Sequence, residues 1–216
     1  MPQSWHVRYA IDARDTIDFV NEDWDAFALH NAGASIVRSR VLGRSIWDFM
    51  DDAPTEEFYR MLFDRVRDGR SNIQFGFRCD SDTERRFLRM EIACANERRI
   101  DFSVTPIAVE TRPSSKLFSD RADRSDQLVS VCSWCKRVRC SDGSWREIEQ
   151  AMPLIQPFRG NEVPSITHGM CADCLAIELR VLNEHSGNDD RLIAFGEFDV
   201  PALVELRSVD GDRPNP

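Results

Sequence analysis

Two pairs of cysteines have the spacing with which proteins bind a single metal ion. Cys132 and Cys135 form one Cys-x-x-Cys pair, Cys171 and Cys174 form the other, and 35 residues separate the pairs. Two intervening residues let both thiolates of a pair reach one ion from a tight turn, and two pairs supply the tetrahedral sulfur set that zinc prefers. Four thiolates leave no coordination position for water, so this spacing predicts a structural zinc site and no catalysis.

The neighbours of these pairs leave some alternatives open. His168 lies three residues before Cys171, where it would either replace one thiolate as a zinc ligand or donate a hydrogen bond to one. Four cysteines also hold iron–sulfur clusters, and Cys-x-x-Cys pairs also form disulfides or redox-active dithiols. Lys136 and Leu175 follow the pairs, which excludes the Cys-x-x-Cys-His sequence of c-type haem attachment. We expect zinc, and we treat Cys140 as a spare thiol.

The residues around the pairs have the composition of a small ordered module. We expect a strand over residues 136–140, a turn at 142–143, and a helix that a capping box at 144–147 opens and Pro153 ends. Good helix formers after Cys171 place the second pair at a helix N-terminus, where thiolates are favoured over thiols. No buried strand is expected before Cys171, which disfavours a thioredoxin-like redox pair.

The first half of the chain shows two hydrophobic periods. Apolar residues alternate with polar ones in five segments, which predicts strands over residues 5–11, 17–19, 73–79, 88–94 and 100–104. Helical spacing predicts two longer helices, one capped by Asn21 and one capped by Thr55. Short polar turns join the last three strands, so these strands are expected to pair antiparallel.

Three motifs in this part of the chain occur in an order that is typical of one family. They are Tyr9-Ala-Ile-Asp-Ala, Ile17-Asp-Phe-Val-Asn-Glu-Asp-Trp and Val41-Leu-Gly-Arg-Ser-Ile-Trp-Asp-Phe, followed by the last three strands. On these motifs, residues 5–110 resemble the PAS domain, a small sensory and interaction module. The resemblance implies an α+β fold in which a five-stranded antiparallel sheet carries short helices on one face. It also implies a space between sheet and helices that either holds a ligand or is filled by packed side chains.

The sequence leaves the ligand of that space unknown. The flavin-binding branch of the family carries a reactive cysteine in a helix, whereas Cys79 and Cys94 are expected on strands as core residues. A haem ligand would have to come from a lone histidine such as His30, which we expect near a helix end. Seven aromatic side chains are candidates for lining a pocket or for filling the core: Trp24, Phe27, Trp47, Phe58, Phe75, Phe77 and Phe102.

A second resemblance covers residues 131–175. The segments Cys132-Ser-Trp-Cys-Lys and His168-Gly-Met-Cys-Ala-Asp-Cys are similar to the C-terminal tails of bacterial PAS and response-regulator-type signalling proteins. This resemblance implies a regulatory context and brings no assigned activity. The sequence has no Gly-rich phosphate loop and no histidine-kinase or nucleotide-cyclase signature, so we do not expect an enzyme.

Charge and composition exclude several classes of protein. The chain has 216 residues with 37 acidic and 28 basic side chains, and its net charge is −9. Binding to nucleic acid or to anionic lipid needs an excess of Lys and Arg, so neither is expected. No apolar run approaches the ~18 residues of a membrane span, and the N-terminus lacks a signal-peptide pattern, so we expect a cytoplasmic protein. Nearly all the basic side chains are arginines, and this preference over lysine indicates a GC-rich, bacterial genome.

These features predict an α+β chain with four parts. Residues 1–110 form the PAS-like domain, 111–128 a linker, 129–185 the metal-stabilised α+β module with zinc, and 186–216 a C-terminal extension. We expect a bacterial signal-transduction protein that binds a protein partner, or a second copy of itself, through the PAS-like domain. Two alternatives stay open: a thiol-based redox or metal sensor that uses the cysteine pairs, and a DNA-binding regulator that uses the basic run 136–139.

Overall fold

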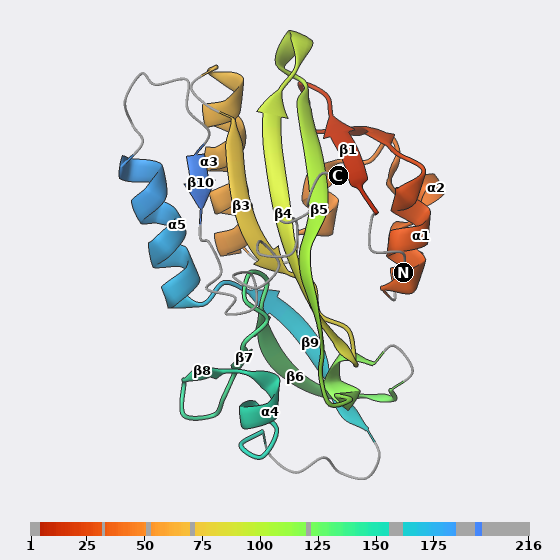
Figure 1. The fold of residues 1–216 in the computed structure, drawn as a ribbon, viewed down its shortest axis with the longest axis vertical. Coiled ribbons are helices and arrows are strands. Elements are labelled where there is room, and N and C mark those ends of the chain that lie inside the picture. Colours follow the sequence, from red (N-terminus) through yellow and green to blue (C-terminus); the bar gives the residue numbers. More distant parts are fainter. Residues whose placement is uncertain are drawn as a thin grey trace, which may run out of the picture.

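The computed structural model describes residues 5–31, 33–50, 53–69, 72–119, 122–155, 162–184 and 193–195. These residues form a mixed α+β structure with two β-sheets that follow one another along the long axis of the molecule (Figure 1). The larger sheet holds the N-terminal strands, and the smaller sheet holds the strands that carry the cysteine pairs. Among the described residues, no helix combines the length and the apolar content needed to cross a membrane.

The larger sheet consists of five antiparallel strands and one parallel strand at its edge. The antiparallel strands follow the order β3-β4-β5-β1-β2, and β10 pairs parallel to β3. Their bounds are Val7–Ile11 for β1, Ile17–Val20 for β2, Ile73–Arg78 for β3, Glu84–Cys94 for β4, Ile100–Thr111 for β5 and Ile193–Phe195 for β10. The five antiparallel strands confirm the prediction from alternation. β4 and β5 exceed their predicted lengths because residues 84–87 pair with residues 108–111.

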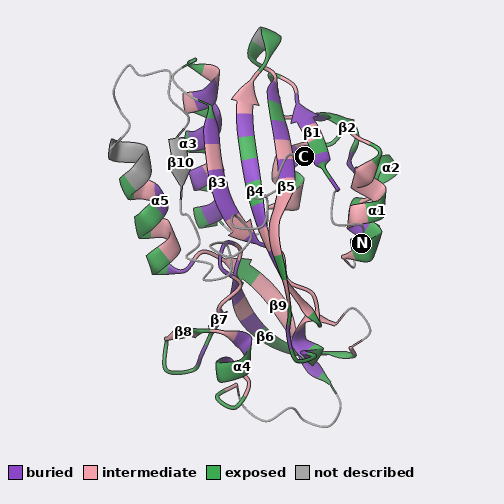
Figure 2. Cartoon of the chain, in the orientation of Figure 1, coloured by how far each residue is buried: buried purple, intermediate pink, exposed green. Residues whose placement is uncertain are grey.

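Short helices pack on one face of this sheet, and α3 lies behind it in Figure 1. α1 spans Asp23–His30, α2 spans Arg38–Val41, α3 spans Ala53–Arg67, and the 3-10 helices η1, η2 and η3 span Ala34–Ile36, Ile46–Phe49 and Asn96–Arg98. α3 buries Phe58, Leu62, Phe63 and Val66 against the sheet, and the Phe63 and Phe102 rings lie 5.6 Å apart. Buried residues accordingly concentrate along the strands of the larger sheet (Figure 2).

Two of the predicted helix caps are wrong. The Asn21 side chain accepts a hydrogen bond from Arg8 N at 3.0 Å and donates one to His6 O at 2.6 Å, so it holds β1 instead of capping α1. Thr55 lies inside α3, which begins at Ala53. Both residues have the right type for a cap, but strand contacts and an earlier helix start decide their roles.

The smaller sheet joins the two cysteine pairs. Its strands are β6 (Arg124–Cys132), β7 (Val138–Arg139), β8 (Trp145–Arg146) and β9 (Val163–Gly169), in the order β8-β7-β6-β9. β6 and β9 are parallel, whereas β6 with β7 and β7 with β8 are antiparallel. α4 spans Ile148–Ala151, and α5 spans Ala172–Glu184 directly after Cys171. The prediction that the second cysteine pair lies at the N-terminus of a helix is therefore confirmed.

Other expectations about this region are wrong. A strand, β9, does precede Cys171; Pro164 and Gly169 weaken its apolar pattern, which is why the sequence does not indicate it. The expected capping box at 144–147 does not open a helix, because Trp145 and Arg146 form β8 and Glu147 precedes α4 without a side-chain cap.

The predicted turn at 142–143 is confirmed, since Gly143 has a φ of +82° and Ser144 N donates to Asp142 Oδ1 at 2.9 Å.

The segment 111–128, expected as a linker, contains ordered structure. The 3-10 helix η4 spans Lys116–Phe118, and the first residues of β6 also belong to it. Leu117 is fully buried in a second apolar core, beneath the smaller sheet, together with Val131 and Ile148. Arg112 is buried as well and forms an ion pair with Asp80 at 3.2 Å. The polar composition of the segment therefore reflects buried ion pairs as well as solvent exposure.

Candidate metal centre and adjoining cavity

The four paired cysteines converge on one point at the junction of the two sheets. The sulfur atoms of Cys132, Cys135, Cys171 and Cys174 all lie within 4.8 Å of one another, and the sulfurs of Cys135 and Cys171 are 3.8 Å apart. A tetrahedral ion with metal–sulfur bonds of about 2.3 Å requires sulfur–sulfur distances of about 3.8 Å. The cluster therefore has the dimensions and the donors for one metal ion.

Parallel strand pairing brings the two cysteine pairs together. β6 ends at Cys132, and this residue lies opposite Gly169, the last residue of β9. Ser133 N donates to Gly169 O at 2.7 Å, which continues the pairing for one residue beyond the strand. Because parallel strands end at the same edge of a sheet, both pairs emerge side by side although 35 residues separate them.

Backbone geometry shapes a tight turn at residues 132–136, which we call the first cysteine turn. Lys136 has a φ of +57°, and its N–H donates to Cys132 O at 3.0 Å. Two further N–H groups point at sulfur: Cys171 N donates to Cys132 Sγ at 3.4 Å, and Cys174 N donates to Cys171 Sγ at 3.5 Å. Such donors favour thiolate over thiol, as a metal ligand requires.

The thiols of the cluster share their protons. Hydrogen bonds from Cys135 and the other cysteines hold the pKa of Cys132 far below its ordinary value, whereas hydrogen bonding to Cys132 raises the pKa of Cys135. Hydrogen bonding to Cys132 opposes ionisation of Cys171, but Cys135 and Cys174 outweigh it and bring the pKa of Cys171 to about 7. Four adjacent thiolates repel one another without a cation, so metal binding would release the remaining protons.

His168 and the other three cysteines lie outside this cluster. His168 is exposed on β9 and is not among the four clustered groups, so the structure does not bring it together with the cysteines as a ligand; its alternative role as a hydrogen-bond donor to a thiolate stays a prediction. Cys140 is buried in the core beneath the smaller sheet, with its thiol 3.8 Å from Val138 O. All seven cysteines are free, and Cys79 and Cys94 are half-buried against the core of the larger sheet.

A cavity of about 340 Å³ lies between the larger sheet, its helices and the first cysteine turn. Of the predicted pocket residues, Trp24, Phe75 and Phe77 line it, and Phe27 lines a smaller adjoining pocket. Phe58 and Phe102 are instead buried in the core, and Trp47 lines neither pocket. The hydrophobic pattern of the sequence predicts that these aromatic residues face the interior, but it does not predict which of their rings border a cavity.

Sequence reasoning missed several lining residues. Tyr9 and Tyr59 border the cavity, and so do Ser133, Trp134 and Lys136 of the first cysteine turn. Tyr9 could have been found, because it alternates with Val7 and Ile11 on the inner face of β1. The residues of the cysteine turn could not, because their spacing indicates metal binding and nothing about a neighbouring cavity.

Trp134 inserts from the first cysteine turn into the core of the larger sheet. Its side chain is 4 % exposed, and it stacks on Phe75 with ring centroids 5.2 Å apart and an interplanar angle of 24°. Phe58 meets it edge-on at 5.3 Å. Its carbonyl oxygen accepts a hydrogen bond from Arg78 N at 2.8 Å. The metal centre and the larger sheet thus share one apolar core.

Glu178 of α5 is a buried carboxyl that interacts with Trp134. Burial raises its pKa to about 8, and the indole N–H of Trp134 lowers it only in part. That contact falls short of a full hydrogen bond, since neither Trp134 Nε1 nor Glu178 Oε2 has a hydrogen-bond partner. At neutral pH this carboxyl is therefore mainly protonated.

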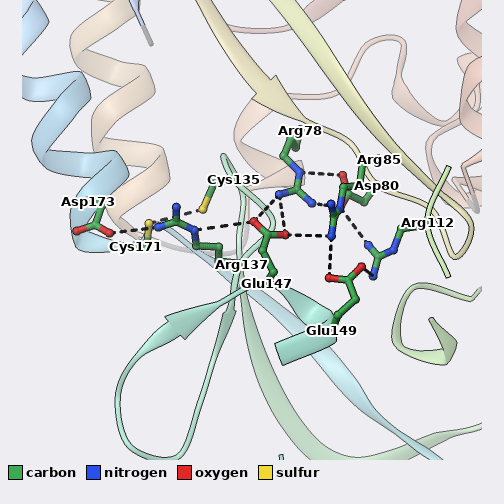
Figure 3. Close-up of polar contacts among 10 residues, drawn as sticks. All are labelled: Arg78, Asp80, Arg85, Arg112, Cys135, Arg137, Glu147, Glu149, Cys171 and Asp173. Carbon is green, nitrogen blue, oxygen red and sulfur yellow. Dashed lines mark hydrogen bonds and ion pairs between the residues drawn. The ribbon is translucent and has the colours of Figure 1, made fainter. Parts of the chain in front are cut away.

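An ion-pair network fastens the β3–β4 hairpin to the cysteine module (Figure 3). Arg78 pairs with Asp80 and, at 2.8 Å, with Glu147. Burial opposes the charge of Arg78, but the hydrogen bond and the charge of Asp80 outweigh it and raise the pKa of Arg78 above its ordinary value. The remaining links are Arg112 with Asp80 and Glu149, Arg85 with Glu147 and Glu149, and Arg137 with Glu147 and Asp173.

This arrangement can bind one metal ion and can enclose one small molecule beside it. Four sulfur ligands would leave no position for water on the ion, so its role would be to fold the chain. No protein-family model matches the chain, and no curated protein matches it.

Proposed function

We propose that this chain is a bacterial signal-transduction protein without catalytic activity. In it, a PAS-like domain at residues 1–110 senses a small molecule or binds a protein partner, including a second copy of the chain. A structural zinc module at residues 129–185 is docked against that domain and passes its state on. The proposal combines the resemblances of the sequence with the shared core of the two parts.

The fold supports the PAS-like assignment. Five antiparallel strands with short helices on one face are what that resemblance implies. The cavity between them supports a sensory use, because a domain that only presented a surface would have no need for an interior space.

The sulfur geometry supports zinc. In iron–sulfur clusters the cysteines ligate several irons held apart by sulfide, whereas here all four sulfurs fit around one ion. Zinc would be held by Cys132, Cys135, Cys171 and Cys174, and it would supply folding free energy to a segment too short to bury much apolar area.

The single observation that carries the proposal is the position of Trp134. This residue lies between two metal-binding cysteines, yet its ring stacks on Phe75 of the larger sheet. Any change in the metal centre or in the cavity would therefore act on the same side chain. This contact gives a physical route by which a signal in the PAS-like domain reaches the zinc module.

The metal is tested on the full-length chain by elemental analysis and by thermal unfolding with and without a strong chelator. We expect about one zinc per chain and a lower unfolding temperature after chelation. Cys171→Ser should lose the metal, while Cys140→Ser, the matched control outside the cluster, should keep it. Iron with visible absorption, or metal-free protein that a chelator leaves unchanged, would contradict the zinc assignment.

A redox sensor is the second candidate, and the convergence of four free thiols favours it. Cysteines this close together can form disulfides when an oxidant reaches them, and they would then no longer hold a metal. Mild peroxide should then release zinc, and a reductant should restore binding. Retention of zinc under peroxide would exclude this function.

A DNA-binding role is less well supported. Arg137, in the middle of the basic run 136–139, forms ion pairs with Asp173 at 3.3 Å and with Glu147 at 4.0 Å. These contacts neutralise part of the basic run that a DNA-binding role would use for phosphate contacts. We expect no band shift with duplex DNA at low salt.

A further inference from the structure

The cavity beside the metal centre has room for a small organic molecule. Its volume of about 340 Å³ lies at the lower end of the range for ligand sites and corresponds to roughly eleven water volumes. An apolar pocket of about 130 Å³ adjoins it, and the two share Tyr9, Trp24 and Phe77 as walls. A ligand of about ten to fifteen non-hydrogen atoms fits this space.

Aromatic side chains are the largest group among the residues that line the cavity, and aliphatic side chains are the next. Tyr9 and Trp24 meet edge-on with centroids 5.3 Å apart, and Trp134 stacks on Phe75 on the side of the cysteine turn. Rings that border a space at these angles offer both faces and edges to a guest ring. The wall therefore favours an aromatic ligand over a flexible aliphatic one.

The polar groups of the cavity are mostly hydrogen-bond donors. No hydrogen bond to another described residue occupies the hydroxyl of Tyr9 or of Tyr59. Burial raises the pKa of both phenols above the ordinary value, so both remain neutral O–H donors at physiological pH. The hydroxyl of Ser133 lies on the same wall. A ligand with acceptor oxygens would satisfy these donors.

The charge of the cavity is opposite to that of the chain. Arg78 and Lys136 line it, and none of the described lining residues is a carboxylate, although the chain carries a net charge of −9. Asp80 and Glu147 neutralise Arg78. Lys136 makes no ion pair with any described residue. One positive side chain that no described carboxylate pairs with thus stands beside an apolar space, where it can pair with an anion.

We propose that this cavity binds a small aromatic monocarboxylate, with its ring among the aromatic walls and its carboxylate at Lys136. This inference rests on the proposed function and names the ligand class that the sensory domain takes. Lys136 and Ser133 belong to the first cysteine turn, which carries two of the four candidate metal ligands. Ligand binding and metal binding therefore stabilise each other, and by linkage each raises the affinity for the other by the same factor.

The test uses 3-phenylpropionate and its neutral isostere 3-phenylpropanamide as calorimetric probes on the zinc-loaded full chain. We expect the acid to bind about tenfold or more tightly than the amide, because only the acid pairs with Lys136. Lys136→Met should reduce the affinity for the acid to that for the amide and leave the amide unchanged. Lys116→Met removes the only other lysine, which is exposed on η4, and should change neither affinity.

A second variant guards against damage to the cysteine turn. Tyr59→Phe keeps the ring, lies far from the cysteines in sequence, and should weaken binding of the acid without loss of zinc. Equal affinity of wild-type protein for acid and amide, absence of binding to both, or equal losses in the two lysine variants would overturn the proposal.

The linkage gives a readout that separates this inference from the proposed function. Saturating 3-phenylpropionate should slow the removal of zinc by a chelator, whereas the amide at the same concentration should slow it less. If zinc is present and structural but its release is the same with acid and with amide, the ligand inference fails and the zinc module stands. If the protein binds no zinc, the proposed function fails first.

Discussion

Replacement of Trp134 by alanine removes the side chain that joins the metal centre to the larger sheet. The indole is 4 % exposed and contacts the rings of Phe75 at 5.2 Å and Phe58 at 5.3 Å. Loss of a buried Trp side chain costs about 3–5 kcal/mol of unfolding free energy, because transfer and cavity terms add. For a chain of this size, each kcal/mol lowers the unfolding temperature by roughly 2–4 °C, so Trp134→Ala should lower it by roughly 6–20 °C.

The assay is thermal unfolding of zinc-loaded protein, followed by far-UV circular dichroism. Trp145→Ala is the matched control, because Trp145 is half-buried on β8 and its loss should cost less. Trp134→Phe should fall between the wild type and Trp134→Ala, since it keeps an aromatic ring against Phe75. A Trp134→Ala protein that unfolds within about 2 °C of the wild type would refute a shared core.

Two further predictions concern buried charged groups. The pKa of Glu178 in the folded state, about 8, lies above its ordinary value of 4.5. The native fold therefore prefers the protonated carboxyl. The contribution of this protonated group to the free energy of unfolding is complete at low pH and is lost as the pH rises from 4.5 through 8. Glu178→Gln should therefore flatten this dependence and, above pH 8, exceed the wild type by about 5 kcal/mol at most in urea unfolding. Arg112→Met leaves the buried carboxylate of Asp80 with one partner fewer and should cost about 3–5 kcal/mol in the same assay. Arg85→Met, at a more exposed position, should cost about 1 kcal/mol or less; equal losses in the two arginine variants would contradict a role for burial.

The sequence contains enough information to predict the larger sheet. Alternation at Ile73, Phe75 and Phe77 has the period of a half-buried strand, and no competing signal interrupts it. β10 could not be predicted, because three residues at a sheet edge carry too short a pattern. The same limit applies to β8, whose two residues are fixed by pairing and not by propensity. The strand predicted over residues 136–140 is shorter in the structure, where β7 spans Val138–Arg139.

The candidate site also combines features that the sequence predicts with features that it does not. The four cysteine ligands follow from local spacing, since each pair must close a tight turn whatever surrounds it. The exposure of His168 follows from the register of β9 against β6, which no local pattern encodes. The place of Trp134 in the core of the larger sheet depends on how the two sheets meet, and this long-range contact leaves no trace in the surrounding residues.

The most direct test of whether the metal centre positions the core of the larger sheet is amide hydrogen exchange at Arg78. Its N–H donates to Trp134 O at 2.8 Å across the junction, whereas the neighbouring Cys79 N–H donates to Arg86 O at 2.9 Å within the β3–β4 hairpin. Removal of the metal from the full-length protein should speed exchange at Arg78 and leave exchange at Cys79 nearly unchanged. If exchange at Arg78 is as slow after metal removal as before it, the metal centre is not coupled to the larger sheet.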